Sequence, residues 1–146
     1  MPVQQKTIVV MRHAKAEQAG PTDFERQLAP RGVADATAAG AWLAATGVVP
    51  NAALVSAAER TRQTWESLAA GASWDLGATY DRGLYDAGPD TALDLVRGLD
   101  EAVSCVVMVG HNPTMAYLAT VLDDGDGDPG ASAQLATGYP TCALTV

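Results

Sequence analysis

The sequence predicts a layered α/β fold in a single domain. Strand signals and helix signals alternate along the chain, which is typical of α/β layers rather than of separate helical and strand domains. The chain has 146 residues, of which 48% are hydrophobic. That length suffices for one domain with a substantial core and is short for two. We therefore expect one domain over residues 1–146.

Four segments are expected to form strands. Lys6 to Met11 and Ser104 to Val109 are continuous hydrophobic runs rich in β-branched residues, as in strands buried on both faces. Shorter strands are expected at Ala53 to Val55 and near Thr79. The two long runs are the strongest strand signals in the chain.

The first two intervening segments carry helix signals. Pro30 and Gly47 bracket an alanine-rich helix, since proline favours the first helical position and glycine the position after the last. The segment Ser56-Ala57-Ala58-Glu59 has the pattern of a capping box. It predicts a helix from there to about Ala70, with Arg60 in its first turn.

Two more helices are expected in the second half of the chain. Asp90 to Ala102 has apolar residues on one helical face. Asn112 is a natural N-cap, and Pro113 is a natural first helical residue. A helix is therefore expected from there to Leu122.

The C-terminal part is expected to be mostly non-helical. The run Asp123 to Gly130 resembles a calcium loop, but Gln134 stands at loop position twelve, where a calcium loop needs glutamate. We therefore expect a solvated turn there. The tail from Gln134 to Val146 is expected to form two short strands around a turn at Gly138-Tyr139-Pro140.

The composition excludes several classes of protein. No stretch approaches the roughly 18 to 20 apolar residues that span a bilayer, and the N-terminal MPVQQKT lacks an apolar export segment. We expect a cytoplasmic protein with no membrane partner. The two cysteines, Cys105 and Cys142, are too few for a disulfide framework or a zinc ribbon. Each is expected in a strand, as a small core residue.

The charge pattern favours a small anion over a polyanion. The formal net charge is −8, which argues against a nucleic-acid partner because phosphate backbones are bound by clustered lysine and arginine. Six of the nine basic residues nevertheless fall near the first histidine and near Ser56: Arg12, Lys15, Arg26, Arg31, Arg60 and Arg62. This clustering favours a local anion pocket, and a chance group of solvated side chains is the alternative.

The only two histidines each follow a predicted buried strand. His13 ends the segment IVVMRH, and His111 follows VVMVG. Ligands of open α/β sheets bind at the carboxyl ends of the strands. Two histidines at strand exits, one of them beside Arg12, therefore indicate one shared anion site.

Four motifs in chain order carry a resemblance to a known family. They are Arg12-His13-Ala14, Arg26-Gln27-Leu28 leading to Gly32, Ser56 to Thr64, and Gly110-His111-Asn112-Pro113. Their order and spacing resemble those of the histidine phosphatase superfamily, and within it the small SixA-type phosphohistidine phosphatases. The chain departs from the family pattern at Ala14, where glycine is usual, and at Ala29, where threonine is usual.

The resemblance implies a fold and a chemistry. The fold is a three-layer α/β/α sandwich around a mostly parallel central sheet. The activity is that of a metal-independent phosphatase without a cofactor, acting through a phosphohistidine at His13. Arg12, Arg60 and His111 would bind the phosphoryl group. A neutral imidazole is a competent nucleophile toward phosphorus, and arginine forks suit the phosphoryl oxygens.

Two further residues, Arg26 and Asp86, are weaker candidates. Asp23 and Arg26 lie in the loop after the first motif, within reach of the pocket rim, and Arg26 is a candidate phosphate contact. Asp86 is the candidate general acid, with an ordinary turn aspartate as the alternative. A phosphoramidate leaving group needs less protonation than an alkoxide, so a missing acid fits phosphohistidine on a protein as the substrate.

Two other functions remain open at this point. One is a phosphomonoesterase that acts on a small phosphate ester with the same site. The other is a non-catalytic module that binds phosphate or phosphohistidine through Arg12, Arg60 and His111. The expected partner is accordingly a phosphorylated protein or a small phosphate ester.

Overall fold

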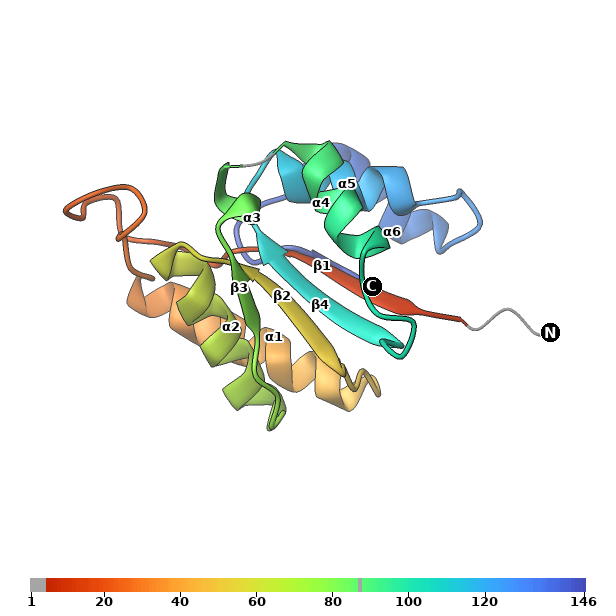
Figure 1. Cartoon of the computed structure of the whole chain (residues 1–146), viewed down its shortest axis with the longest axis horizontal. Helices are drawn as coiled ribbons and strands as arrows, with labels where there is room; N and C mark the ends of the chain where they lie inside the picture. Colours follow the sequence, from red (N-terminus) through yellow and green to blue (C-terminus); the bar gives the residue numbers. More distant parts are fainter. Residues whose placement is uncertain (1–4, 87) are drawn as a thin grey trace.

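A computed structural model describes residues 5–86 and 88–146 and shows a sheet between two layers of helices (Figure 1). The described residues exclude 1–4, which belong to the N-terminal segment discussed above, and Ala87. The five-stranded sheet has the order β3-β2-β4-β1-β5. Its strands are β1 (Thr7–Arg12), β2 (Ala52–Ser56), β3 (Thr79–Asp81), β4 (Cys105–Gly110) and β5 (Leu144–Thr145). All neighbouring pairs are parallel except β1 with β5.

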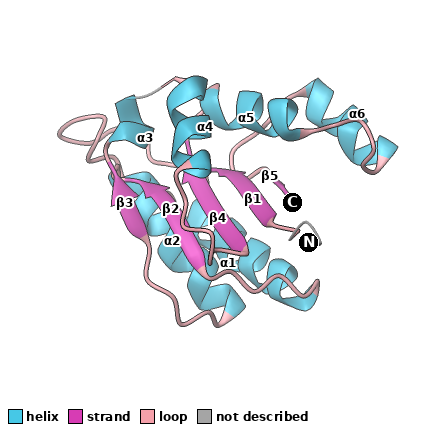
Figure 2. Ribbon diagram, turned by 45° about the vertical axis from the view of Figure 1, so that its right-hand side comes forward, coloured by secondary structure: helices cyan, strands magenta, loops and turns pink. Residues whose placement is uncertain are grey.

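The helices cover both faces of the sheet (Figure 2). One layer holds α1 (Pro30–Ala45) and α2 (Glu59–Ala72). The other holds α3 (Gly83–Asp86), α4 (Pro89–Arg97), α5 (Thr114–Leu122) and α6 (Pro129–Thr137). The predicted three-layer α/β/α sandwich with a mostly parallel sheet is confirmed. No helix of the described residues is long and apolar enough to cross a membrane.

The core has two large clusters, one on each face of the sheet, and a small third cluster of Ala14, Leu28 and Ala36. In β1, Val9 and Met11 pack with Leu68 of α2, whereas Val10 packs with Leu118 of α5. This alternation follows from the pleat, which directs successive side chains to opposite faces. Because both faces of β1 are buried, Val9, Val10 and Met11 are all hydrophobic.

Helices α1 and α2 pack closely through two glycines. A Cβ atom added at Gly40 would lie 2.0 Å from the carbonyl oxygen of Leu68, and one added at Gly71 would lie 2.0 Å from that of Thr37. Real Cβ atoms essentially never come so close to another heavy atom. The two backbones are therefore in direct contact at this crossing.

Several sequence-based expectations about helix ends were wrong. Helix α2 starts at Glu59 without a side-chain cap, because its N-cap residue is Ala58, whereas Ser56 ends β2 and its hydroxyl lies 2.7 Å from Nε2 of His111. Helix α5 starts at Thr114 rather than at Asn112, whose amide donates to the carbonyl of Tyr139 at 2.7 Å. Helix α4 ends at Arg97, short of the expected Ala102.

The tail also differs from the expectation of two strands. Residues 129–137 form α6, whose N-cap Asp128 accepts a hydrogen bond from the amide of Ala131 at 2.9 Å. Only Leu144–Thr145 is a strand. Cys142 is half-buried, has a φ of 66° and does not belong to a strand. Cys105 is buried in β4, as expected.

Candidate active site

The two histidines lie side by side at the carboxyl ends of neighbouring strands. Arg12 at the end of β1 is in register with Gly110 at the end of β4. The amide of His13 donates to the carbonyl of Gly110 at 2.9 Å. The imidazole centroids of His13 and His111 are consequently 5.5 Å apart. The structure thus brings together the two strand-exit histidines, which are nearly a hundred residues apart in the sequence.

The His13 ring is fixed in one tautomer. Its Nδ1 lies 2.7 Å from the carbonyl oxygen of Ala14, and since a carbonyl only accepts, Nδ1 must carry the proton. The Nε2 atom then has a free lone pair. Burial, aided by the positive charges of Arg60 and Arg12, lowers the pKa of His13 to about 4, although the hydrogen bond to Ala14 opposes this. At neutral pH the ring is therefore uncharged, the state in which an imidazole can act as a nucleophile.

The substitution of alanine at position 14 is accommodated without backbone strain. Ala14 is fully buried and is not among the described residues with positive φ. Its amide donates to the hydroxyl of Thr64 in α2 at 3.0 Å. Ala14, whose carbonyl orients His13, is therefore bonded through its amide to a residue of the third motif.

His111 has the opposite arrangement of ring protons. Its Nδ1 lies 3.3 Å from Nη2 of Arg60, and because a guanidinium only donates, this nitrogen must accept. The proton is then on Nε2, which donates to the hydroxyl of Ser56 at 2.7 Å. Burial and the charge of Arg60 lower the pKa of His111 to about 3.

Two arginines lie near His13, since the charge of each lowers the pKa of this histidine. Arg60, in the first turn of α2, is 6% exposed. Arg12 donates from Nη1 to the carbonyl of Tyr139 at 3.1 Å. The Nε atoms of both arginines are buried and have no hydrogen-bond partner among the described residues. Two guanidinium groups whose charges both act on His13 make the site suited to an oxyanion.

Asp23 connects the loop after β1 to the site. Its carboxylate accepts from the hydroxyl of Tyr85 at 2.6 Å, from Nη2 of Arg60 at 3.2 Å and from Nε of Arg26 at 3.0 Å. Its carbonyl accepts from Nη1 of Arg60 at 2.7 Å. The hydrogen bond from Tyr85, with the charges of the arginines, lowers the pKa of Asp23 to about 2. The group is ionised at neutral pH.

The weaker candidates lie away from the histidines or are already engaged. Each nitrogen of the Arg26 guanidinium bonds within its own loop, to Asp23 or to the carbonyl of Glu17. Asp86 in α3 faces Arg82 at 3.9 Å, with both side chains about two-thirds exposed. The roles of Arg26 as a phosphate contact and of Asp86 as a general acid stay predictions.

The six-residue basic cluster does not converge on the site as a whole. The guanidinium of Arg62 lies 4.0 Å from the ring centroid of Tyr80. Arg31 is mostly exposed and pairs with Asp35 at 3.6 Å. Arg12, Arg26 and Arg60 are the members whose charge lowers the pKa of His13.

Sequence reasoning missed three contributors to the site. The hydroxyl of Ser56 orients His111, the carbonyl of Tyr139 orients Arg12, and the phenol of Tyr85 orients Asp23. Ser56 begins the third motif, but the capping-box pattern predicts a role for it at the start of a helix and not a contact with His111. Tyr85 neighboured the candidate acid Asp86, and the sequence carried no signal that it approaches a loop 62 residues away.

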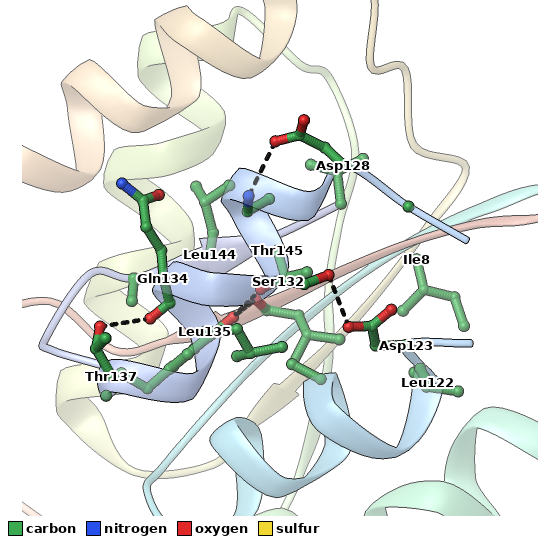
Figure 3. A pocket seen from close by; sticks show the side chains of 18 of the residues that line it. Ile8, Leu122, Asp123, Asp128, Ser132, Gln134, Leu135, Thr137, Leu144 and Thr145 are labelled. Carbon is green, nitrogen blue, oxygen red and sulfur yellow. Dashed lines mark hydrogen bonds between the residues drawn. The ribbon is translucent and has the colours of Figure 1, made fainter. Parts of the chain in front are cut away.

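A separate cavity of about 910 Å³ lies between α6 and the edge formed by β1 and β5 (Figure 3). Apolar side chains such as Ile8, Leu135 and Leu144 line it, with Asp123 and Asp128 nearby. Neither histidine contributes to it. Within residues 5–86 and 88–146, no three His, Cys, Asp or Glu side chains form a group able to hold a metal ion.

The fold and the site define a phosphate-handling α/β protein, and comparison with known proteins gives the family. Residues 8–88 match the Histidine phosphatase superfamily (branch 1). An uncharacterized protein of Mycobacterium tuberculosis is 38% identical over 138 residues, which cover 93% of this chain and 85% of that protein. The chain belongs to the histidine phosphatase superfamily, and it is a phosphatase, a hydrolase.

Solved structures agree with this assignment. A chain assigned to the phosphohistidine phosphatase SixA of Agrobacterium tumefaciens has a TM-score of 0.80 at 32% identity, covering 94% of this chain and 87% of that one. The corresponding SixA chain of Nakamurella has a TM-score of 0.80 at 33% identity, covering 99% and 84%. A protein histidine phosphatase SixA complexed with tungstate has a TM-score of 0.72 at 26% identity, covering 94% and 84%. The predicted resemblance to SixA-type proteins is confirmed.

Proposed function

We propose that this phosphatase removes the phosphoryl group from phosphohistidine on a protein, through a phosphohistidine at its own His13. The observation that carries the proposal is the tautomer of His13. Its Nδ1 donates to the Ala14 carbonyl at 2.7 Å, which leaves the lone pair of Nε2 free beside Arg60 and His111. A neutral, oriented imidazole next to cationic donors suits attack on phosphorus.

The reaction proceeds in two displacements. The Nε2 lone pair of His13 forms a bond to phosphorus while the bond to the leaving group breaks and takes its electron pair away. Water then attacks the phosphohistidine, phosphate leaves, and Nε2 regains its lone pair. Arg12, Arg60 and His111 bind the phosphoryl oxygens in both steps, where positioning and positive charge supply most of the catalysis. The scheme uses no metal ion.

The state of the acidic residues supports a phosphoramidate substrate. An alkoxide leaving group needs a proton donor, whereas a protonated imidazole departs as a neutral molecule. Asp23, the carboxylate bonded to Arg60, is ionised with a pKa of about 2. Asp86 faces Arg82 at the surface. Similar chains are described as SixA phosphohistidine phosphatases, and one such SixA was solved with tungstate, an oxyanion.

Phosphate release from two substrates tests the proposal. The wild type and His13→Ala are compared on a phosphohistidine-bearing protein and on an aryl phosphate ester, in buffer with EDTA. We expect turnover that depends on His13 and a strong preference for phosphohistidine. Preference for the ester would instead indicate a phosphomonoesterase of small molecules. Absence of turnover that depends on His13 on either substrate would indicate a binding module.

A further inference from the structure

Successive aromatic ring contacts connect His13 to Phe24 through His111 and Tyr85. The His111 centroid is 5.5 Å from that of His13 and 5.5 Å from that of Tyr85. The Tyr85 centroid is in turn 5.0 Å from that of Phe24. Tyr85 meets His111 and Phe24 edge to face, with interplanar angles of 74° and 81°. Tyr85 is thus in ring contact with one of the two histidines of the site.

The Tyr85 ring is held in place before a substrate arrives. Its hydroxyl donates to Oδ2 of Asp23 at 2.6 Å, and the guanidinium carbon of Arg60 lies 5.9 Å from its centroid. Helix α3, which carries it, lies at the same end of the sheet as the loop after β1 (Figure 2). The side chain is only half-buried. A fixed ring with exposed surface is thus available next to the phosphoryl site.

We propose that Tyr85 forms an aromatic subsite for the imidazole leaving group of phosphohistidine. The inference rests on the proposed function and extends it to the part of the substrate that departs. In-line displacement puts the leaving group on the side of phosphorus opposite His13 Nε2. Tyr85 contacts His111, one of the residues proposed to bind the phosphoryl group, and its side chain is half-exposed, so a ring attached to the bound phosphoryl group can reach it.

The chemistry of the leaving ring suits this subsite. The imidazole of phosphohistidine takes a proton from water on the nitrogen that does not carry phosphorus, and the ring becomes cationic. Attack by Nε2 of His13 forms the new N–P bond and breaks the old one. The electron pair of the broken bond stays on the departing nitrogen, and neutral imidazole leaves. A cationic ring is attracted to a tyrosine face, and the ionised Asp23 beside the phenol strengthens that attraction.

A comparison of two P–N substrates tests the subsite. The full chain is assayed for kcat/KM on a phosphohistidine peptide and on phosphoramidate, which has the P–N bond without a ring. The readout is the ratio of the two values. We expect Tyr85→Leu to lower this ratio about 2- to 12-fold, the range of an aromatic pair, and Tyr85→Phe to preserve it. Tyr117→Leu, at a position on α5 that is 52% exposed, is the matched control.

Each contrary result identifies what failed. If Tyr85→Leu leaves the ratio of the two kcat/KM values unchanged, the subsite is overturned. An equal loss of kcat/KM on both substrates would reflect the positioning of Asp23 and Arg60 and not a contact with the leaving ring. A ratio in Tyr85→Phe as low as in Tyr85→Leu also overturns it, since the hydroxyl and not the ring would then matter. Failure of the proposed function is visible in the wild type alone, as absence of hydrolysis of the phosphohistidine peptide.

Discussion

The carboxylate of Asp23 lies 3.2 Å from Nη2 of Arg60, and this ion pair fastens the loop after β1 to the first turn of α2. The two partners differ in environment, because the Arg60 side chain is 7% exposed and that of Asp23 is 55% exposed. The buried arginine thus depends on a carboxylate that reaches it from the surface. This relationship makes the loop part of the site.

Asp23→Asn should weaken both the fold and the catalysis. Loss of the carboxylate leaves the buried Arg60 with less compensation, and we expect about 1–2 kcal/mol of lost stability, since the exposure of Asp23 reduces the full penalty of a broken buried pair. A less firmly held Arg60 should lower kcat/KM about 10-fold. Urea denaturation and steady-state kinetics measure the two effects. Asp94→Asn, which removes an exposed pair with Arg97, should change neither.

Both histidines should stay neutral well below the usual imidazole pKa. Burial is the main reason that the pKa of His13 is about 4 and that of His111 about 3. Since the chain has two histidines, their ring signals in an NMR pH titration are easily assigned with His13→Asn. We expect both signals to hold their neutral positions from pH 8 to pH 5. A midpoint near 6.5 for either ring would contradict this.

The same burial should make the fold sensitive to moderate acid. In the unfolded chain the histidines bind protons below about pH 6.5, but in the folded chain only near pH 4 and pH 3. Between these values the unfolded state binds more protons, so stability falls as pH falls, by about 1.4 kcal/mol per pH unit for each histidine. Urea denaturation at pH 7, 6 and 5 measures this slope. His13→Asn should reduce it, and an unchanged slope in that variant would be evidence against a buried neutral His13.

Arg60→Lys should lose most of the activity although it keeps the charge. Arg60 uses Nη1 and Nη2 for Asp23 and His111, and a lysine has no fork with which to hold these partners and an anion together. We expect kcat/KM to fall at least about 100-fold. Arg62→Lys is the matched control, since Arg62 lies on the same helix and packs over Tyr80. Comparable losses in the two variants would mean that helix α2, and not the Arg60 fork, is responsible.

Asp86→Asn should leave the hydrolysis of phosphohistidine within about 2-fold of the wild type. Its carboxylate faces Arg82 at 3.9 Å on the exposed side of α3. Rates on both the phosphohistidine protein and the aryl ester measure its contribution. A selective loss on the ester would instead identify Asp86 as a general acid and favour the small-molecule phosphomonoesterase.

The sequence predicted the parts of the site that depend on the backbone. The hydrophobic runs of β1 and β4 are unmistakable, and parallel strands bring their carboxyl ends together, so the meeting of His13 and His111 follows. The contact between Asp23 and Tyr85 depends instead on how a loop and a one-turn helix pack, and no periodicity encodes that. Likewise, the small and polar residues of α6 carry almost no amphipathic pattern, and therefore looked like a turn and a strand.

The crossing of α1 and α2 at Gly40 and Gly71 affects how mutants of this protein should be interpreted. Because the backbones touch there without intervening side chains, a methyl group added at Gly40 must move α1 and α2 apart at this crossing. The N-terminal turn of α2 carries Arg60, so a shift of α2 would displace the guanidinium that we propose binds the phosphoryl group. Inactive variants at this crossing would accordingly report a displaced arginine, and a screen for lost activity would select them together with true active-site mutants.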